Sequence, residues 1–420
     1  MINKPSTLFK NIFHFYYLFA ILLFTLVIIG CTKLKETSST SADDKLWVGT
    51  WSTAPQLVEP HNNPPEPGLS NNTIRQVVRV SIGGDSLRLR LSNEFSKTPV
   101  IIKSIEVAAS ISGSTIDSSS IKKLTFSNHP ETLINAGITI TSDAFSFDLK
   151  PRMDVAITIY FGETPQDITG HPGSRTTSYI LANDKTLSID FNDAVKTDHW
   201  YIINGIDVFA TKPTAAVAII GNSITDGRGS GTNKQNRWPD ILSERLLKNP
   251  STKNIGVLNM GIGGNCVLNG GLGPTALNRF ERDILKQHGV RWLIILEGVN
   301  DLGITRDSDS ANQVAQDLIA AYQKMINKAH AKNIKVYGAT ILPFTKSFYY
   351  KDYREVARNT VNDWIRNSGK FDAVIDFDKI MQNPEDTSIL LPEIHSGDYL
   401  HPNEAGYVMM GEAIDLKLFE

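Results

Sequence analysis

The stretch that decides the fold is AAVAIIGNSITDG, residues 215–227. Its first six residues are continuously apolar, which is typical of a strand buried on both faces of a parallel sheet. The run breaks at Gly221, so the loop that follows presents Ser223 at the carboxyl end of the strand. Backbone amides after this break can hold a developing negative charge. The alternative is that Ser223 only caps a helix.

Length and composition limit the possibilities. A chain of 420 residues is too long for one ordinary domain, so we expect two. Hydrophobic residues make up 41% of the chain, which is enough for two cores. The 42 basic and 44 acidic residues leave a net charge of -2, and no basic block is present. We therefore expect no nucleic-acid partner.

The first segment predicts export. Two lysines precede the apolar residues 15–29, and a small residue directly precedes Cys31. This order resembles the lipobox of bacterial lipoproteins, with Ile28 where Leu is usual. The resemblance implies that residues 1–30 are a lipoprotein signal peptide, that Cys31 is lipidated, and that the exported protein is anchored in the bacterial cell envelope, at the outer membrane or the periplasmic face. The alternative is an uncleaved membrane anchor, for which the run is slightly short.

Residues 31–45 lack apolar periodicity and are predicted to form a flexible tether. From residue 46 to 211 apolar residues recur with period two, as at 87–91, where leucines alternate with arginines. Short strands separated by Gly, Ser, Asn and Pro clusters predict a β-sandwich or jelly-roll domain. The Gly-Gly-Asp-Ser turn at 83–86 predicts that the strands on either side of it pair as a hairpin.

Several side chains of this region are candidates for binding. Four aromatic residues lie near its two ends: Trp47, Trp51, Trp200 and Tyr201. They would either stack on sugar rings or pack inside the protein, and we expect packing. No cysteine or carboxylate lies at ligand spacing beside the loop residues His61 and His171, so we expect no metal. Cys266 has no partner if Cys31 carries lipid, and we expect it to be a buried filler.

From residue 212 to 420 strand and helix patterns alternate. Five apolar strands are predicted at 215–220, 254–259, 292–297, 335–341 and 373–377. Helices are predicted at 239–247, 275–288, 312–332, 353–366 and 404–418. This alternation predicts a doubly wound, five-stranded parallel sheet with helices on both faces, in which ligands bind at the strand carboxyl ends.

Four polar segments follow these predicted strands, and together they can supply an acyl-transfer site. Ser223 is the candidate nucleophile, and His401 is the candidate base because imidazole changes charge near neutral pH. Asp398 lies three residues before His401 and can orient its ring. Gly264 and Asn300, with the N–H of Ser223, can stabilise an oxyanion. Each segment alone also fits a turn, a helix start or a cap, so the hypothesis depends on their meeting at one sheet edge.

The four segments resemble, in order, the blocks of the SGNH hydrolase (GDSL esterase/lipase) superfamily. They are Gly221-Asn222-Ser223, residues 259–265, Gly298-Val299-Asn300-Asp301 and Asp398-Tyr399-Leu400-His401. The resemblance implies a flavodoxin-like sheet, a mechanism without cofactors, and a Ser223, His401 and Asp398 triad with Gly264 and Asn300 in the oxyanion hole. Asn222 stands where the family usually has Asp, which is not a triad member.

The first domain resembles a narrower branch. Residues 49–52, 73–76 and 88–93 look like the acetylxylan-esterase-like branch, which joins a β domain to the hydrolase domain. The resemblance implies a carbohydrate ester as substrate, such as acetylated xylan or a related glycan, from which short acyl groups, above all acetyl, are removed. Arg228 and Arg237, in the loop after Ser223, either line the substrate entrance or have a structural role.

Two other functions stay open at this point. One is a lipase or esterase for long acyl chains, which would share the same triad. The other is a glycan-binding surface lipoprotein without catalysis, against which the intact Ser, His and Asp argue.

Overall fold

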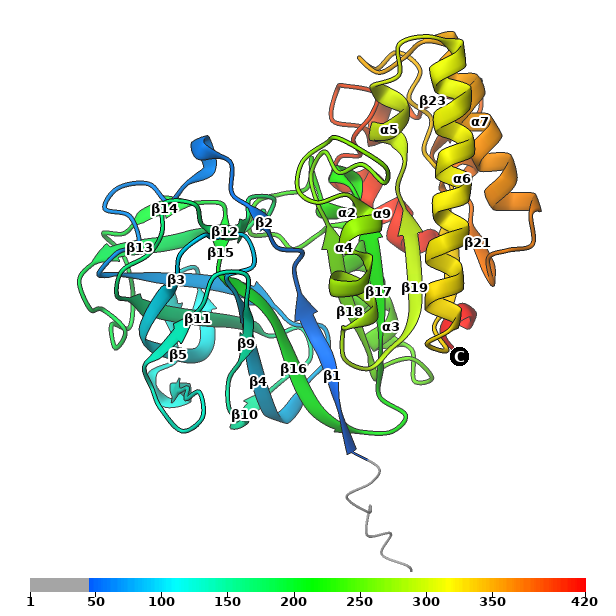
Figure 1. Ribbon diagram of the computed structural model, residues 1–420. Coiled ribbons are helices and arrows are strands. Elements are labelled where there is room, and N and C mark those ends of the chain that lie inside the picture. Colours follow the sequence, from blue (N-terminus) through cyan, green and yellow to red (C-terminus); the bar gives the residue numbers. More distant parts are fainter. Residues whose placement is uncertain (1–44) are drawn as a thin grey trace, which may run out of the picture. The chain divides into compact units, whose positions relative to one another are not determined.

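The computed structural model describes residues 45–420, which belong to one compact unit (Figure 1). The predicted signal peptide, the lipidation site at Cys31 and residues 31–44 of the predicted tether lie outside the described residues. Lys45, predicted as the last tether residue, instead begins the first strand. None of the helices within the described residues has the length and apolarity needed to cross a bilayer.

A parallel sheet of five strands forms the second half of the chain, as predicted. Its strand order is β18-β17-β19-β20-β21. The strands are β17 (Ala215–Gly221), β18 (Ile255–Gly261), β19 (Val290–Leu296), β20 (Lys335–Ala339) and β21 (Ala373–Ile375). β17 lies between β18 and β19 with all seven residues buried, because both its faces are covered by helices. The apolar run that begins at Ala215 therefore forms an inner strand of the sheet, as predicted.

Helices cover both faces of this sheet (Figure 1). One face carries α4 (Ala276–Phe280), α6 (Ser308–His330) and α7 (Asp352–Asn367); the other carries α3 (Trp238–Lys248), α8 (Phe377–Met381) and α9 (Glu404–Ala413). Ala218 and Ile220 pack toward the first group, and Val217 and Ile219 pack toward the second. This alternation is the doubly wound arrangement that the sequence predicts.

Two of the predicted helices differ from the prediction. The segment expected at 275–288 is α4 followed by a π-helical turn, Glu281–Leu285. The last helix ends at Ala413, and a separate 3-10 turn, Leu416–Phe419, follows it. The short helices α2 (Ser223–Asp226) and α5 (Val299–Gly303) begin directly after β17 and β19, where only polar loops were expected.

The first half of the chain is antiparallel, as predicted. One sheet contains β1 (Lys45–Ser52), β16 (Ile203–Thr211), β4 (Gly84–Ser92), β10 (Phe145–Leu149) and β9 (Thr139–Thr141). The larger sheet is built on β14 (Val195–Thr197), β13 (Ser178–Ala182), β3 (Asn72–Arg79), β11 (Asp154–Phe161), β5 (Val100–Ser112) and β6 (Thr115–Ile116), with β7 (Lys122–Lys123) and β8 (Thr132–Ile134) on β5. Both sheets share one apolar core, which makes a β-sandwich.

The predicted hairpin at 83–86 is wrong. β3 pairs with β11 and β13, whereas β4 pairs with β16, β10 and β9 in the other sheet. At these glycines the chain instead crosses from the sheet that contains β3 to the sheet that contains β4. A Cβ on Gly83 would lie 2.3 Å from the backbone oxygen of Leu149, so the close approach of two backbones requires glycine there.

A third small sheet, β15-β12-β2, holds aromatic residues that pack inside the protein. It contains β2 (Gln56–Leu57), β12 (Thr169–His171) and β15 (Trp200–Tyr201). Trp51 and Trp200 are buried and meet edge to face with ring centroids 5.1 Å apart, and Tyr201 is fully buried. The packing interpretation of these three aromatic residues is confirmed.

The sandwich core continues into the parallel sheet. Leu258 of β18 and Ala216 of β17 belong to the same apolar cluster as the sandwich. The backbone N–H of Gly49 donates to the oxygen of His288 at 3.0 Å, and the N–H of Val257 donates to Ser81 Oγ at 3.0 Å. Because residues 45–420 belong to one compact unit, the division into domains at residue 212 stays a prediction.

Candidate active site

Ser223 lies at the carboxyl end of β17, on the first residue of α2. Asn222 caps this helix, because its Oδ1 accepts from the N–H of Ile224 at 3.1 Å. A Cβ on Gly221 would lie 2.1 Å from Thr225 Oγ1, so only glycine permits the sharp change from strand to helix. As the first helical residue, Ser223 also has a backbone N–H without an intrahelical acceptor.

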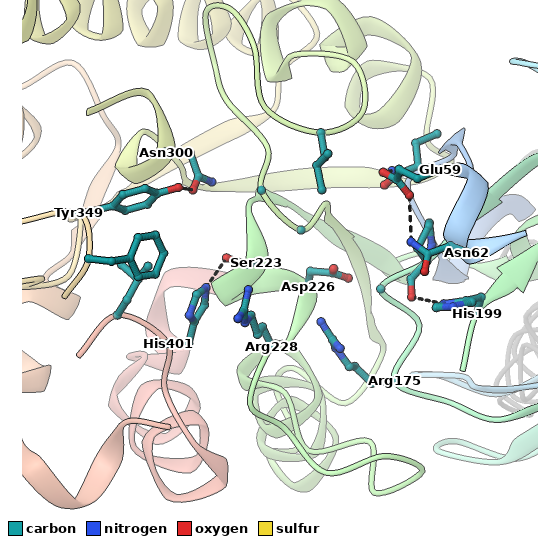
Figure 2. A pocket seen from close by; sticks show the side chains of 18 residues that line it. Glu59, Asn62, Arg175, His199, Ser223, Asp226, Arg228, Asn300, Tyr349 and His401 are labelled. Carbon is teal, nitrogen blue, oxygen red and sulfur yellow. Dashed lines mark hydrogen bonds between the residues drawn. The ribbon is translucent and has the colours of Figure 1, made fainter. Parts of the chain in front are cut away.

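His401 and Asp398 meet Ser223 in space, although 178 residues separate Ser223 from His401. Ser223 Oγ lies 2.9 Å from His401 Nε2, and His401 Nδ1 lies 2.6 Å from Asp398 Oδ2 (Figure 2). The loop before α9 holds the two residues. Asp398 Oδ1 also accepts from the backbone N–H groups of Leu400 and His401 at 3.0 and 2.9 Å. Both oxygens of the carboxylate are therefore engaged in fixing the loop and the ring.

The charges of this trio follow from their surroundings. Burial lowers the pKa of His401 below its ordinary value of 6.5, and Arg228 and Arg175 lower it further while Asp398 raises it. Burial alone would raise the pKa of Asp398, but the hydrogen bonds from His401 hold it at about 2. At neutral pH the ring is thus neutral, with its proton on Nδ1 facing the carboxylate and Nε2 free to accept from Ser223.

Gly264 and Asn300 line the same pocket as Ser223. Gly264 adopts φ +69°, and its backbone N–H has no acceptor among the described residues. Asn300 Nδ2 donates to the oxygen of Asn265 at 2.8 Å, and Tyr349 donates to Asn300 Oδ1 at 2.9 Å. Tyr349 therefore fixes which end of the amide is the donor, and the second hydrogen on Nδ2 is left for a ligand. Sequence reasoning missed Tyr349, which belongs to no recognised segment.

The unusual Asn222 has a buried carboxyl group beside it. Asn222 Nδ2 donates to Glu297 Oε2 at 3.3 Å. Burial raises the pKa of Glu297 to about 8, although Arg279 Nη2 lies 3.5 Å from its Oε1 and lowers it. An aspartate at position 222 would place a second acidic group against Glu297, whereas the asparagine amide supplies a donor to it. This contact accounts for the amide at this position.

A buried arginine supports the site from below. Arg279 is fully buried and donates to the backbone oxygens of Gly221 and Met260 at 3.1 and 2.6 Å. It also donates to Asn265 Oδ1 at 3.0 Å and pairs with Asp283 at 3.2 Å. It thus ties the ends of β17 and β18 to the loop that carries Gly264. The sequence offered no signal for this role, because Arg279 lies inside an ordinary helical pattern.

The pocket at the site has a volume of about 330 Å³, and both halves of the chain line it. The antiparallel half contributes Gln56, Glu59, Asn62, Pro172, Gly173, Arg175 and His199. Sequence reasoning assigned none of these residues to the site. No local motif could have done so, because they reach the pocket only through the packing of the two halves.

His171 connects the antiparallel half to the helix that carries Ser223. Its Nε2 lies 2.8 Å from Asp226 Oδ1, and its Nδ1 lies 2.9 Å from the oxygen of Ala54. Both His171 and Asp226 are buried. Asp226 follows Ser223 by three residues, and its partner comes from the antiparallel half of the chain. His171 was considered only as a metal ligand from the sequence.

The sequence also singled out Arg228, Arg237 and Cys266, and the structure gives them different roles. Arg228 lines the pocket, which is the first of the two roles considered for it. Arg237 does not line it and has the structural role instead: it pairs with Asp240 at the start of α3 at 2.7 Å. Arg237 is the N-cap residue of α3, and its guanidinium also donates to Gln235 Oε1 and, at 3.4 Å, to the oxygen of Ser174. Cys266 is fully buried, as expected, and burial raises the pKa of its thiol to about 12.

A comparison with protein families finds a match to the GDSL-like lipase/acylhydrolase family over residues 219–409. This segment contains Ser223, Gly264, Asn300, Asp398 and His401. It is a GDSL-family hydrolase domain. The predicted superfamily and the predicted class of enzyme, an ester hydrolase, are thereby confirmed.

Solved structures resemble the GDSL domain more distantly. A lipolytic protein of the G-D-S-L family from Desulfitobacterium hafniense is 21% identical, with 47% of this chain and 97% of that chain covered and a TM-score of 0.36. A GDSL-like lipase from Bacteroides thetaiotaomicron is 21% identical over 50% and 90% of the chains, with a TM-score of 0.36. An acetylxylan esterase from Geobacillus stearothermophilus is 19% identical over 47% and 91%, with a TM-score of 0.36. A sequence comparison with curated proteins gave no match.

The pH dependence of hydrolysis tests the state of His401. The lowered pKa of His401 predicts that kcat/KM for 4-nitrophenyl acetate rises with pH and reaches its plateau through an apparent pKa below 6.5. The sign follows because only the neutral ring can accept the Ser223 proton. A pH-rate profile with a midpoint above 7 would contradict this assignment.

Tyr349→Phe tests the orientation of the Asn300 amide. Loss of one neutral hydrogen bond to Asn300 Oδ1 is expected to lower kcat by roughly 2- to 10-fold with a smaller change in KM. Tyr350→Phe is the matched control, since Tyr350 is half-buried and bonds only Asp352 at its side chain. Equal kcat values for Tyr349→Phe and the wild type would remove Tyr349 from this role.

Proposed function

We propose that the protein is a serine esterase in which Ser223, His401 and Asp398 act as nucleophile, base and orienting acid. The observation that carries this proposal is the chain of hydrogen bonds from Ser223 Oγ through His401 to Asp398, at 2.9 and 2.6 Å, at the wall of an open pocket. Nucleophile, base and orienting group at these distances are the components of acyl transfer to serine.

The reaction follows from this geometry. Ser223 Oγ attacks the ester carbonyl while His401 Nε2 takes its proton, and Asp398 stabilises the imidazolium that forms. The N–H groups of Ser223 and Gly264 and the amide of Asn300 donate to the oxyanion. His401 then gives the proton to the departing alcohol, which leaves an acyl group on Ser223. Water, activated by His401, releases this acyl group as an acid and restores the hydroxyl.

The walls of the pocket favour a short acyl group on a carbohydrate. About 330 Å³ is near the lower end of the range for ligand pockets. Most of the side chains from the antiparallel half are polar: Gln56, Glu59, Asn62, Arg175 and His199. Polar walls suit the hydroxyl groups of a glycan better than a long acyl chain. Acetylated xylan or a related glycan is therefore the substrate class that we propose.

The proposed location comes from the sequence. The lipobox-like order before Cys31 supports export and lipid anchoring in the cell envelope, where an acetylated glycan is accessible to the enzyme. The proposed partners are thus a carbohydrate ester and, through the lipid at Cys31, a membrane.

Ser223→Ala tests the nucleophile. Removing the attacking oxygen is expected to lower kcat for 4-nitrophenyl acetate and for acetate release from acetylated xylan by at least roughly 10,000-fold. Ser251→Ala, at an exposed serine remote from the pocket, is the control and should keep wild-type rates. Circular dichroism would show that both variants fold. A folded Ser223→Ala variant with more than a tenth of the wild-type rate would exclude Ser223 as the nucleophile.

A further inference from the structure

Two arginine side chains enter the pocket without a protein partner. Arg175 comes from the antiparallel half and Arg228 from the loop after α2, and both line the pocket (Figure 2). Within residues 45–420 neither guanidinium has a hydrogen bond or an ion pair to another residue, and Nε of Arg175 is buried without a partner. By contrast, Arg79, Arg88, Arg279, Arg358 and Arg366 all pair with carboxylates.

The backbones of both arginines are held firmly. Arg175 adopts φ +51°, a left-handed conformation that is unusual for a residue with a side chain, and its oxygen accepts from Asn233 N–H at 2.9 Å. The N–H of Arg228 donates to the oxygen of Ser223 at 2.9 Å, and its own oxygen accepts from Tyr407 at 2.6 Å. Rigid backbones that carry unpaired guanidinium groups are suited to a ligand with a negative charge.

The acidic side chains of the pocket do not neutralise this pair. Asp226 bonds His171 at 2.8 Å, and no guanidinium nitrogen in the described residues lies within ion-pair distance of its carboxylate. Glu59 accepts from Gln56 at 2.8 Å and from Asn62 at 3.1 Å. Figure 2 shows Glu59 at the opposite side of the pocket from His401. The positive charge is therefore concentrated near Ser223.

The positions of the two arginines indicate which portion of a bound ester, acyl or alcohol, they would contact. Figure 2 shows Arg228 and Arg175 on the side of Ser223 away from Asn300, which would hold the carbonyl oxygen. Both arginines also lower the pKa of His401, the residue that would protonate the departing alcohol. The charges thus act where the alcohol portion of the ester would lie.

We propose that Arg175 and Arg228 form a carboxylate-binding subsite, and that the preferred substrate carries an acid group on its alcohol portion, as an acetylated uronic acid residue of a glycan does. This inference rests on the proposed esterase function and narrows its substrate class. Guanidinium groups bind carboxylates through paired, charge-assisted hydrogen bonds. A neutral sugar offers these arginines hydroxyl acceptors but no opposite charge.

A matched pair of substrates tests the subsite in the full chain. Acetylated methyl glucuronoside and acetylated methyl glucoside differ only in a carboxylate against a hydroxymethyl group. For the wild type, kcat/KM is expected to favour the glucuronoside by roughly 10-fold or more, mainly through KM, and 0.5 M salt should reduce this preference. In Arg175→Gln the ratio should fall toward 1, and Arg175→Lys should restore part of it.

Arg306→Gln is the control, because Arg306 is exposed, has no side-chain partner in the described residues and lines a different pocket. This variant should keep the wild-type ratio. A wild-type ratio of 1 or less, or an unchanged ratio in Arg175→Gln, would overturn the subsite. A preference for 4-nitrophenyl hemisuccinate over 4-nitrophenyl butyrate, without a glucuronoside preference, would place the acid on the acyl portion and also contradict the proposal. Failure of the wild type to hydrolyse 4-nitrophenyl acetate would instead refute the esterase function itself.

Discussion

The site depends on one constraint, which is that neighbouring parallel strands end at the same edge of a sheet. β17 lies between β18 and β19, so the segments that follow these three strands necessarily face one space. Ser223, Gly264 and Asn300 come from those three segments. The loop before α9 then brings His401 to within 2.9 Å of Ser223. The parallel direction of the strands thus explains why Ser223, Gly264 and Asn300 lie together although they are far apart in the sequence.

The antiparallel half completes this site. His171 reaches Asp226 on the helix of Ser223, and Arg175 enters the pocket beside Arg228. The continuous core through Leu258 holds the two halves in contact. The GDSL domain therefore holds the candidate triad, whereas the sandwich supplies part of the pocket wall.

The sequence alone predicted the parallel sheet, which is confirmed, and it named the residues of the candidate triad, which the structure brings together, since both have local signals. Continuous apolar runs marked the buried strands, and short polar segments marked their ends. Tyr349, Arg279 and His171 had no such signal, because their roles arise from contacts between distant segments. The prediction of a hairpin at 83–86 was wrong for a related reason. Glycines permit either a hairpin turn or a crossing between sheets, and only the pairing of β3 and β4 with other strands shows which of the two is present.

Covalent labelling tests the central claim most directly. A fluorophosphonate reacts with a serine only where a neighbouring base and an oxyanion site activate it. Peptide mass spectrometry of the labelled wild-type protein is predicted to find one adduct, on Ser223, and His401→Ala should abolish it. An adduct on a different serine, or none on a folded and active enzyme, would contradict the account.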